Sequence, residues 1–529
     1  MPLITELNKL QEQSGYLRED ELRDLSRELR VPLHAIQAVV SFYPHFRTTP
    51  PPKARVAVCR DMACHLAGGE DLCRRVTEVL EAEDVEVQPV SCLGRCDSAP
   101  AAAINDVPLS GRDVQAVITG ARNPDRIETS YPQSQPRRWR FKAYDGETEH
   151  YSVIRRLRAG SAFDVIAEMK AAGLRGMGGA AFPVGMKTEL VAKQPGPVKY
   201  VICNADESEP GTFKDRMILS DLPHLVIEGI MIAAHVVGAQ KGFVFIRHEY
   251  GPERDIVARQ IDTARQSGLL NQDFDIEIFS SPGGYILGEE TALLECMENK
   301  RGEPRNKPPF PGEKGLHGRP TLINNVETLA AVPAILNRGV EWWKSAGTRG
   351  CHGYKFISVS GHVQNADVYQ IPMGTTVREL IDTAGGMKEG KSLKAFAPGG
   401  ASSNFLPADK VDTPIDFDHL ADAGSMLGSG ALFVVAEGTD MLDLATNVVR
   451  FFRNESCGKC VPCRMGSEKA VHMLEAILAQ GGRREQVQLL EELADTMSQT
   501  SICGLGQVAL NPVLSVFKRF PADWERYVK

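Results

Sequence analysis

The 529-residue sequence has no basic block, no apolar run long enough to cross a bilayer, and only 7% aromatic residues. Because its net charge is −8, nucleic acid is not an expected partner. The most apolar stretch, residues 225–239, is shorter than a membrane span and is interrupted by Glu228 and His235. Residues 1–7 have neither a basic start nor an apolar signal core. We therefore expect a cytoplasmic protein with no direct membrane insertion.

Cysteine, in contrast, is frequent and clustered. In a reducing cytoplasm, clustered cysteines are better explained as metal ligands than as disulfides. Eight of the 12 cysteines form two sets at opposite ends of the chain: Cys59, Cys64, Cys92 and Cys96, then Cys457, Cys460, Cys463 and Cys503. Two metal centres on one chain indicate electron transfer.

The second set follows Cys-x2-Cys-x2-Cys, with Cys503 supplied from a distance. This pattern provides the four thiolates of a [4Fe–4S] cluster, whereas structural zinc usually takes two separated Cys-x2-Cys pairs. The spacing of the first set is not that of plant ferredoxins, so a [2Fe–2S] cluster and structural zinc both remain possible; the neighbouring cubane favours the former. The other four cysteines, Cys73, Cys203, Cys296 and Cys351, are interpreted as packing residues.

The chain is too long for one core and should divide into several units. Helical periodicity extends to about residue 48, and a small α/β unit follows at 53–120. Residues 123–140 are rich in Pro, Ser, Gln and Arg, which is typical of a linker. Strands and helices then alternate over 150–340, as in a layered α/β domain. A strand-rich α+β insert at 355–436 precedes helices at 441–520.

A glycine-rich loop at 173–182 lies in the central unit. It formally satisfies Gly-x-Gly-x-x-Ala at Gly176, Gly178 and Ala181, but it follows a predicted helix rather than a strand. The dinucleotide-binding interpretation therefore fails on context. Exposed amides in such a loop can still cradle a phosphate or let a flat ring approach the backbone. Lys187 stands nearby as a positive charge.

Four further polar loops occur in the same unit. Residues 204–211 follow a predicted strand, where a Rossmann-like sheet presents its ligand-binding edge, and their acidic side chains suit ribityl or ribose hydroxyls. Glu289 and Glu290 open a helix, and one of them is explained equally well as a cap. The loops at 307–311 and 324–328 complete a set that indicates a cofactor site.

These segments resemble a known family. The strings GLRGMGGAAFP, NADESEPGTFKDR, GEETALLE, KPPFP, INNVETLA, SCGKCVPCR and SICGLG are similar to the flavin-bearing, NADH-oxidising subunit of respiratory complex I. Its relatives include NAD-reducing hydrogenase diaphorases and β subunits of NAD-dependent molybdenum or tungsten formate dehydrogenases. GYL, FYPHF, the Cys-x4-Cys-His pattern and CLGRCD resemble the family's separate thioredoxin-like [2Fe–2S] subunit. The chain thus looks like a fusion of two subunits.

The resemblance implies a multidomain α/β fold. Its expected parts are a short N-terminal helical bundle (1–50), a thioredoxin-like [2Fe–2S] domain (51–122), a linker (123–149), a Rossmann-like FMN/NADH-binding domain (150–345), a ubiquitin-like (SLBB-type) α+β insert (346–438) and a C-terminal helical [4Fe–4S] bundle (439–529).

The resemblance also implies FMN over the glycine loop and NADH stacked on it beside Phe182 and Phe310, with Glu209 and Glu290 at the NADH hydroxyls. No catalytic proton donor is needed for hydride transfer between stacked rings. The expected cofactor-binding residues are Gly176, Gly178, Gly179, Ala180, Phe182, Lys187, Asn204, Asp206, Glu207, Glu209, Gly288, Glu289, Glu290, Lys307, Phe310, Asn324 and Asn325.

Departures from the family occur at Met177 (commonly Arg), Ala181 (Gly) and 187–190, which lacks two aromatics. No molybdopterin, nickel or quinone site is recognisable, so the chain is expected to serve a catalytic partner. A formate dehydrogenase α subunit carrying a molybdenum or tungsten pterin and further clusters is the favoured partner, from the tail SICGLGQ…NPVLSVFKRFP. The alternatives are a hydrogenase module, complex I, or a non-enzymatic zinc scaffold.

Overall fold

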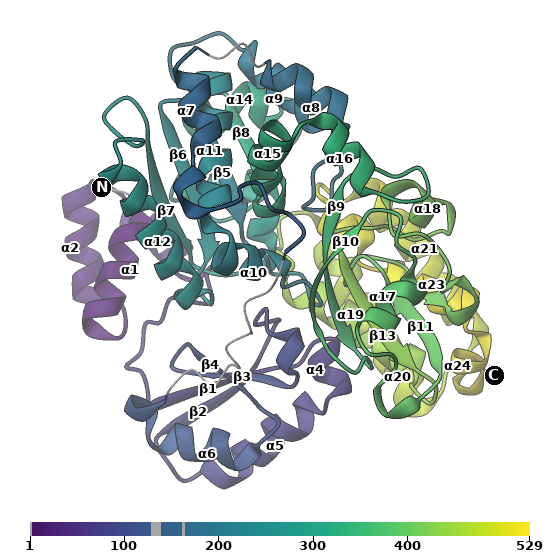
Figure 1. The fold of residues 1–529 in the computed structure, drawn as a ribbon. Coiled ribbons are helices and arrows are strands. Elements are labelled where there is room, and N and C mark those ends of the chain that lie inside the picture. The colour runs from purple at the N-terminus through teal and green to yellow at the C-terminus, as the bar shows by residue number, and fades with distance from the viewer. Residues whose placement is uncertain (1–2, 128–138, 161–163) are drawn as a thin grey trace.

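A computed structural model describes residues 3–127, 139–160 and 164–529. Figure 1 shows the central unit above the small N-terminal α/β unit, with the insert and C-terminal helices side by side to the right. The described residues form three sheets: β2-β1-β3-β4, β7-β6-β5-β8 and β10-β9-β13-β11-β12. This arrangement confirms the predicted multidomain α/β fold.

The N-terminal segment forms three helices, α1 (Leu3–Ser14), α2 (Glu19–Leu29) and α3 (Leu33–Val40). The helical periodicity predicted up to about residue 48 is confirmed, although the chain breaks between α1 and α2. Gly15 adopts a left-handed φ of 77° there, which ends the first helix. Leu3, Ile4 and Leu7 are buried in the same core as the central unit, so these helices pack on it.

The first α/β unit has a mixed sheet. Strand β1 pairs with β2 in parallel and with β3 antiparallel, and β3 pairs with β4 antiparallel. Its elements are β1 (Ala54–Cys59), α4 (Ala63–Leu66), α5 (Gly69–Leu80), β2 (Val85–Val90), β3 (Ala101–Ile104), β4 (Val107–Ser110) and α6 (Val114–Arg122). Cys59 ends β1 and Cys92 follows the end of β2 by two residues, so each cysteine pair begins at the end of a strand.

The central unit is built on a fully parallel sheet. Numbered within the unit, its strands have the order 3-2-1-4, so the connection direction reverses between β5 and β8. Ligands of open α/β sheets bind at the carboxyl ends of strands at this reversal. The strands are β5 (Tyr200–Ala205), β6 (Lys241–Arg247), β7 (Asp275–Ser281) and β8 (Thr321–Asn325). The helices are α7 (Ser152–Arg158), α8 (Val165–Ala172), α9 (Val184–Ala192), α10 (Lys214–Asp221), α11 (Pro223–Val237), α12 (Gly251–Gln266), α13 (Glu290–Met297), α14 (Pro311–Lys314), α15 (Val326–Arg338) and α16 (Val340–Ala346).

The insert is a mixed five-stranded sheet with its own core of buried apolar side chains, including Ile357, Leu380 and Leu432. Its elements are β9 (Tyr354–Gly361), β10 (Asp367–Pro372), α17 (Val377–Thr383), β11 (Leu393–Ala397), β12 (Leu406–Pro407), α18 (Phe417–Asp422) and β13 (Ala431–Ala436). The strands with α17 and α18 confirm the predicted α+β character of the insert.

The C-terminal part is helical, as its periodicity predicts. It consists of α19 (Met441–Asn454), α20 (Val461–Gln480), α21 (Arg484–Thr500), α22 (Gly504–Val508), α23 (Asn511–Arg519) and α24 (Pro521–Trp524). The cysteines of the second set lie in the connections between these helices or in the first turn of one, so packed helices hold each ligand loop in place.

Only part of the segment predicted as a linker, 123–149, lies within the described residues. Residues 128–138 lie outside the described residues. Trp139, Phe141 and Tyr144 are buried, and the first two rings pack against Phe356 of the insert at 5.0 and 6.1 Å. The segment after residue 138 therefore belongs to the packed structure.

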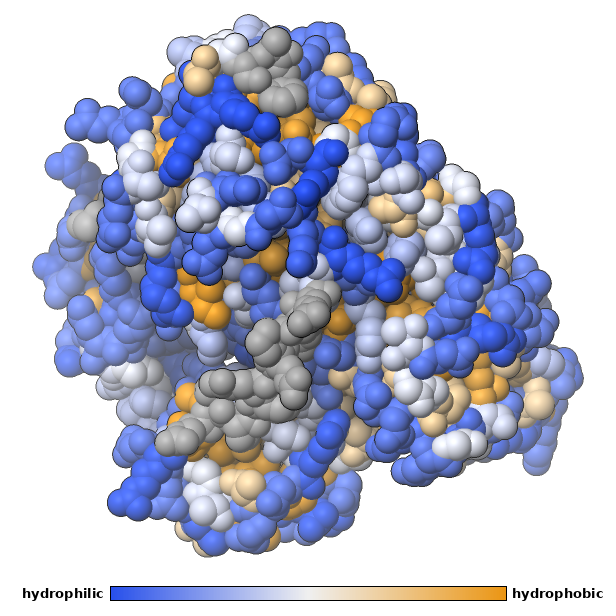
Figure 2. Space-filling model, in the orientation of Figure 1, coloured by the Kyte–Doolittle hydropathy of each residue, from blue (hydrophilic) through white to orange (hydrophobic). Residues whose placement is uncertain are grey.

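The visible face in Figure 2 is mostly hydrophilic, with apolar residues in scattered patches. No single helix of the described residues is long and apolar enough to cross a membrane. The pair α10–α11, bent by 94°, meets the criteria of length and composition together, although α11 is almost wholly buried in the protein.

Candidate functional site

A cavity of about 360 Å³ opens where the carboxyl ends of β5 and β8 adjoin. Its volume falls in the range of small-molecule sites. The register pairs Asn204 with Asn325 at this edge, and both line the cavity. The reversal of strand order thus places the cavity where the fold predicts a ligand.

The glycine loop forms one wall. Gly176 N donates to Phe182 O (2.9 Å) and Val184 N to Leu174 O (2.9 Å), so the loop closes on itself before α9 begins. A Cβ on Gly178 would lie 2.9 Å from Asn325 Cβ, and Gly179 has a φ of 123°. Larger residues cannot occupy this wall without displacing it. It therefore offers bare backbone to a flat ring.

Two neighbouring carboxylates have different roles. Asp206 is buried, its Oδ1 has no hydrogen-bond partner among the described residues, and burial raises its pKa to about 7. Glu207 is also buried, but it accepts hydrogen bonds from the amides of Asp215 and Arg216 and from Tyr250 Oη. Burial, then the charge of Asp215, raises the pKa of Glu207 to about 7. Asp206 is thus available to a ligand hydroxyl, whereas Glu207 holds α10 in place.

Only some of the predicted cofactor-binding residues line the cavity. The predicted residues that line it are Gly178, Gly179, Ala180, Asn204, Asp206, Glu207, Glu209, Gly288, Glu289 and Asn325. Seven others lie outside its lining: Gly176, Phe182, Lys187, Glu290, Lys307, Phe310 and Asn324. Gly176 closes the loop, and Asn324 is buried in β8.

The charged residues outside the cavity form one group. Lys307 Nζ lies 2.8 Å from Glu289 and 2.9 Å from Glu290. Lys187 Nζ donates to Ile323 O (2.7 Å) and lies 3.8 Å from Glu290, and burial lowers its pKa. Glu289 accepts from the amides of Thr291 and Ala292, which identifies it as the helix cap. Glu290 is not the cap, and its carboxylate is paired with Lys307.

Phe182 and Phe310 are unusually exposed for large apolar side chains, at 44% and 55%. Met186 and Leu190 on α9 are exposed as well, at 47% and 53%. Glu209, in contrast, is held from the insert, because its carboxylate accepts from Ser402 N at 2.9 Å. The aromatic faces are therefore free, and the Glu209 position depends on the insert.

Several lining residues were not predicted. Lys214 and Asp215 belong to the string NADESEPGTFKDR, of which only the first half was assigned. The insert and the last helices also contribute, and no local motif marks these residues. The additional lining residues are Ser208, Thr212, Lys214, Asp215, Tyr285, Ile286, Ser402, Met426, Gly428, Ser429, Gly504, Leu505 and Val508.

The first cysteine set converges. All four thiols are at most 4% exposed, and the Sγ atoms of Cys92 and Cys96 are 3.6 Å apart. Ala101 N donates to Cys64 Sγ (3.3 Å) and Gly94 N to Cys92 Sγ (3.4 Å), as amides do to cluster sulfurs. Hydrogen bonds from Cys59 and Cys96 lower the pKa of Cys92, and Arg247 adds to this effect. Four converging thiols fit the [2Fe–2S] centre.

The second set also converges. Cys457, Cys460, Cys463 and Cys503 line one small apolar hollow, together with Ile286, Pro304 and Leu505. Cys460 and Cys503 stand immediately before α20 and α22. A Cβ on Gly506 would lie 2.9 Å from Cys463 Cβ and 2.5 Å from Ser501 Oγ, so glycine is required beside the ligands. An all-thiol set in an apolar hollow fits a [4Fe–4S] cluster.

The first cysteine unit is locked to the rest of the chain through its ligand loops. Arg247 on β6 donates to Cys92 O (2.7 Å) and to Glu207 O (2.5 Å). A buried ion pair joins Arg95 to Glu253 at 3.1 Å. On the other loop, Asn447 of α19 donates to Arg60 O at 2.9 Å. The predicted fusion is thus one interlocked structure at its cysteine loops.

One departure from the resembled family has a backbone consequence. Ala181 adopts a φ of 55°, in the left-handed region. An L-residue there costs about 1–2 kcal/mol, which glycine avoids. Arg175 Nε donates to Ala181 O at 3.1 Å and holds this conformation.

Four family models match the chain. They are described as thioredoxin-like [2Fe-2S] ferredoxin (residues 1–119), Nuo51 FMN-binding domain (169–334), SLBB domain (356–403) and NADH-ubiquinone oxidoreductase-F iron-sulfur binding region (443–527). The FMN, [4Fe–4S] and [2Fe–2S] predictions are therefore confirmed at the level of domains.

Two curated relatives match most of the chain. The NADH-quinone oxidoreductase F subunit of Streptomyces coelicolor is 38% identical over 78% of this chain and 94% of the relative. The NADP-reducing hydrogenase subunit HndC of Solidesulfovibrio fructosivorans is 40% identical over 69% of this chain and 76% of the relative.

A chain of the NAD+-reducing [NiFe]-hydrogenase, in a crystal structure of its air-oxidised state, covers 99% of this chain. This match spans 93% of the hydrogenase chain, with 30% identity and a TM-score of 0.90. The whole arrangement of units therefore recurs in a solved structure.

Proposed function

The chain belongs to the family of NADH-oxidising FMN and iron–sulfur subunits of complex I and NAD-reducing hydrogenases, and on this basis we propose how its residues serve that reaction. We propose that it exchanges hydride with NAD(H) and single electrons with a partner protein. In this proposal, the site residues predicted from the sequence bind FMN and NAD(H) and hold the two clusters.

The observation that carries the proposal is the contact between the cavity and the hollow of the second cysteine set. Ile286 and Leu505 line both, so one layer of side chains separates them. From the cavity wall, Glu207 O is joined through Arg247 to Cys92 O, at the first set. Both cysteine sets thus lie beside one cavity, as electron exchange requires.

FMN, when bound, supplies the conversion between two-electron hydride transfer and the one-electron chemistry of clusters. Gly178 and Gly179 present bare backbone to its ring, and Asp206 and Asn204 offer acceptors to ribityl hydroxyls. The eight cysteines hold the two clusters. The chain's task is to position and shield these groups, and no side chain is needed as an acid or base.

NADH is proposed to lie across the exposed faces of Phe182 and Phe310. Glu209 and Glu290 would accept hydrogen bonds from its hydroxyls, with Lys187 and Lys307 orienting Glu290. An acidic group at this position favours a nucleotide without a 2′-phosphate, since like charges repel.

We expect Phe310→Ala to raise the KM for NADH by about tenfold, because one aromatic stack contributes about 0.5–1.5 kcal/mol beyond its buried area. FMN content and the rate at saturating NADH should be nearly unchanged. NADH:ferricyanide kinetics measure both quantities. Leu190→Ala, at a similarly exposed position on α9, is the control and should leave the KM close to its original value. An unaltered KM in Phe310→Ala would remove this residue from the NADH site.

The proposal also concerns the identity of the partner protein. A hydrogenase module is supported by the hydrogenase chain that covers 99% of this one, including the fused first unit. The tail after Cys503 predicts instead a formate dehydrogenase α subunit with a molybdenum or tungsten pterin. The two NADH-quinone oxidoreductase relatives match 78% and 72% of the chain, less than the hydrogenase chain does.

Metal analysis of the complex, purified anaerobically through a tag on this chain, distinguishes these partners. Nickel beside iron and FMN would identify a hydrogenase module. Molybdenum or tungsten in place of nickel would establish the formate dehydrogenase assignment. Iron without any of these metals would favour complex I or an unrecognised electron acceptor as the partner, and zinc without iron would contradict the electron-transfer function itself.

A further inference from the structure

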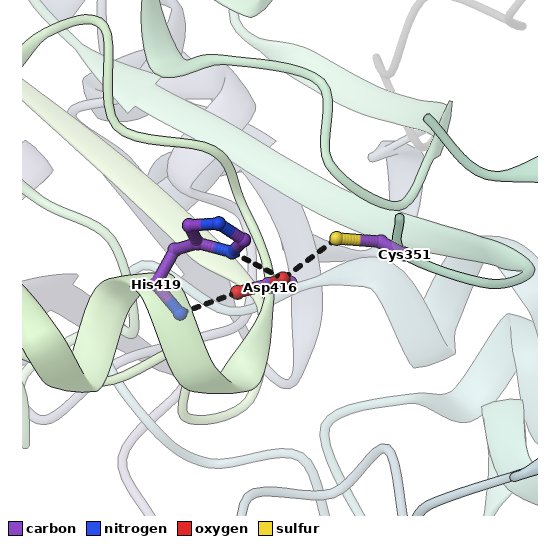
Figure 3. Close-up of side chains that lie close together, drawn as sticks. All are labelled: Cys351, Asp416 and His419. Carbon is purple, nitrogen blue, oxygen red and sulfur yellow. Dashed lines mark hydrogen bonds and ion pairs between the residues drawn. The ribbon is translucent and has the colours of Figure 1, made fainter. Parts of the chain in front are cut away.

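A cluster of three different donor groups lies in the insert, apart from both cysteine sets. Cys351 belongs to the loop between α16 and β9, whereas Asp416 and His419 lie at the start of α18. Among the described residues, the thiol, carboxylate and imidazole donor atoms lie within 4.8 Å of one another. Figure 3 shows the thiol and the imidazole pointing toward the same carboxylate from opposite sides.

The contacts of the cluster converge on one atom. Cys351 Sγ donates a hydrogen bond to Asp416 Oδ2 at 2.7 Å, and His419 Nδ1 lies 2.7 Å from the same oxygen; a metal ion among the three groups would replace both hydrogen bonds. The second oxygen, Oδ1, accepts from His419 N at 2.7 Å and caps α18, so it fixes the carboxylate on the helix. The carboxylate is buried, whereas the imidazole is half-exposed. One side of the cluster is therefore accessible from solvent.

The loop that carries Cys351 is held rigidly. The backbone N–H of Cys351 donates to Thr348 O at 2.9 Å. The glycines at 347, 353 and 374 pack so closely against their neighbours that an added Cβ would clash. The Cβ position at Gly374 is 3.1 Å from Cys351 Sγ itself. The thiol is thus positioned by the backbone rather than by a flexible loop, which is the preorganisation that a ligand site requires.

The order of the three side chains differs from that found around a nucleophilic cysteine. Such a site needs the imidazole next to the thiol, with the carboxylate behind the imidazole. Here the carboxylate stands between them, where a negative charge opposes thiolate formation in the absence of a cation. A cation placed among the three groups would reverse that opposition.

We propose that Cys351, Asp416 and His419 form a Zn²⁺ site. A thiolate, an imidazole nitrogen and a carboxylate oxygen are the three donor types that zinc takes in proteins, and three protein ligands leave a fourth position for water. All three residues line a cavity of about 290 Å³, which has room for that water.

The site is connected to the glycine loop of the central unit. Phe417 and Asp418, between two of the ligands, both contact Arg175: its guanidinium lies 4.4 Å from the Phe417 ring and 3.1 Å from the Asp418 carboxylate. Arg175 also donates to Ala181 O. Zinc at the start of α18 would therefore fasten the insert against the loop that forms the wall of the 360 Å³ cavity.

Alkylation of Cys351 by iodoacetamide, followed by peptide mass spectrometry, tests the site in the full chain with its iron and FMN in place. We expect added Zn²⁺ to slow this alkylation at least about tenfold, because a metal-bound thiolate is a poor nucleophile. Cys73, a half-exposed cysteine on α5, is the internal control and should react at the same rate with or without zinc.

Protection of Cys351 should be lost in His419→Ala and kept in His352→Ala, a histidine next to Cys351 whose Nδ1 lies 3.2 Å from Lys344 O instead. Equilibrium dialysis should show about one zinc fewer per chain in His419→Ala, with iron and FMN contents equal to those of the unaltered protein. Alkylation of Cys351 at the same rate with and without zinc would overturn the proposal, as would equal loss of protection in both histidine variants.

Discussion

A Cys460→Ala variant should contain about two iron atoms per chain, where the unaltered protein contains about six, because one [4Fe–4S] cluster loses a ligand and one [2Fe–2S] cluster remains. Cys460 suits this test because its side chain is only partly buried, so alanine there leaves the packing of α20 almost unchanged. NADH should still bleach the flavin absorbance, whereas electron delivery to the partner should be abolished.

Iron analysis, FMN release and electron paramagnetic resonance measure these outcomes together. Cys59→Ala is the reciprocal variant and should retain about four iron atoms, and Cys73→Ala should retain all of them. A Cys460→Ala protein with full iron and an unchanged cubane spectrum would show that Cys460 is not a ligand. If alanine also removes FMN, Cys460→Ser separates the loss of a ligand from a failure to fold.

Glu327→Gln should lower the free energy of unfolding by about 3–5 kcal/mol, the usual cost of breaking a buried ion pair from one side. Glu327 lies between two buried lysines: its carboxylate is 3.0 Å from Lys214 Nζ and also pairs with Lys355, and the three side chains are at most 4% exposed. The glutamine leaves both lysines short of negative charge. Since Glu327 lies in the first turn of α15 and Lys355 near the start of β9, the loss loosens the junction of central unit and insert.

The cost of Glu327→Gln should shrink as pH rises from 7 to 9. Burial lowers the pKa of Lys355 to about 8, well below the value for a free lysine, so this side chain carries its charge only below that pH. The attraction to Glu327 is therefore present at pH 7 and largely lost at pH 9, while the pair with Lys214 persists. The variant thus loses less relative to the unaltered protein at the higher pH.

Urea unfolding followed by circular dichroism at pH 7 and pH 9 measures both effects. Glu189→Gln removes an exposed carboxylate that pairs with Lys170 and should change the midpoint little. An equally small change in Glu327→Gln, or a cost that does not decrease at pH 9, would contradict the assigned network.

The two cysteine sets could be predicted as cluster ligands from the sequence because cluster chemistry restricts the spacing of ligands. Cys-x2-Cys-x2-Cys is a local pattern, and the first set was visible as two closely spaced pairs, Cys59 with Cys64 and Cys92 with Cys96. The glycine loop and the acidic loop after β5 were likewise readable, since each combines special residues within about ten positions. The boundaries of the helices in the N-terminal segment were harder to predict from the sequence, because the break at Gly15 depends on a single left-handed residue.

The amino-acid sequence alone determined the [4Fe–4S] prediction, since thiol spacing is a property of a short segment, whereas FMN was predicted from the family resemblance of several such segments. Only the tertiary structure decided which side chains share a cavity. Ser402, Leu505 and Lys214 meet around one cavity from three different units, although no spacing relates them. The same holds for Cys351 beside Asp416, 65 positions apart, and for Arg247 at Cys92. Such contacts arise from packing of separate elements, which local pattern cannot encode.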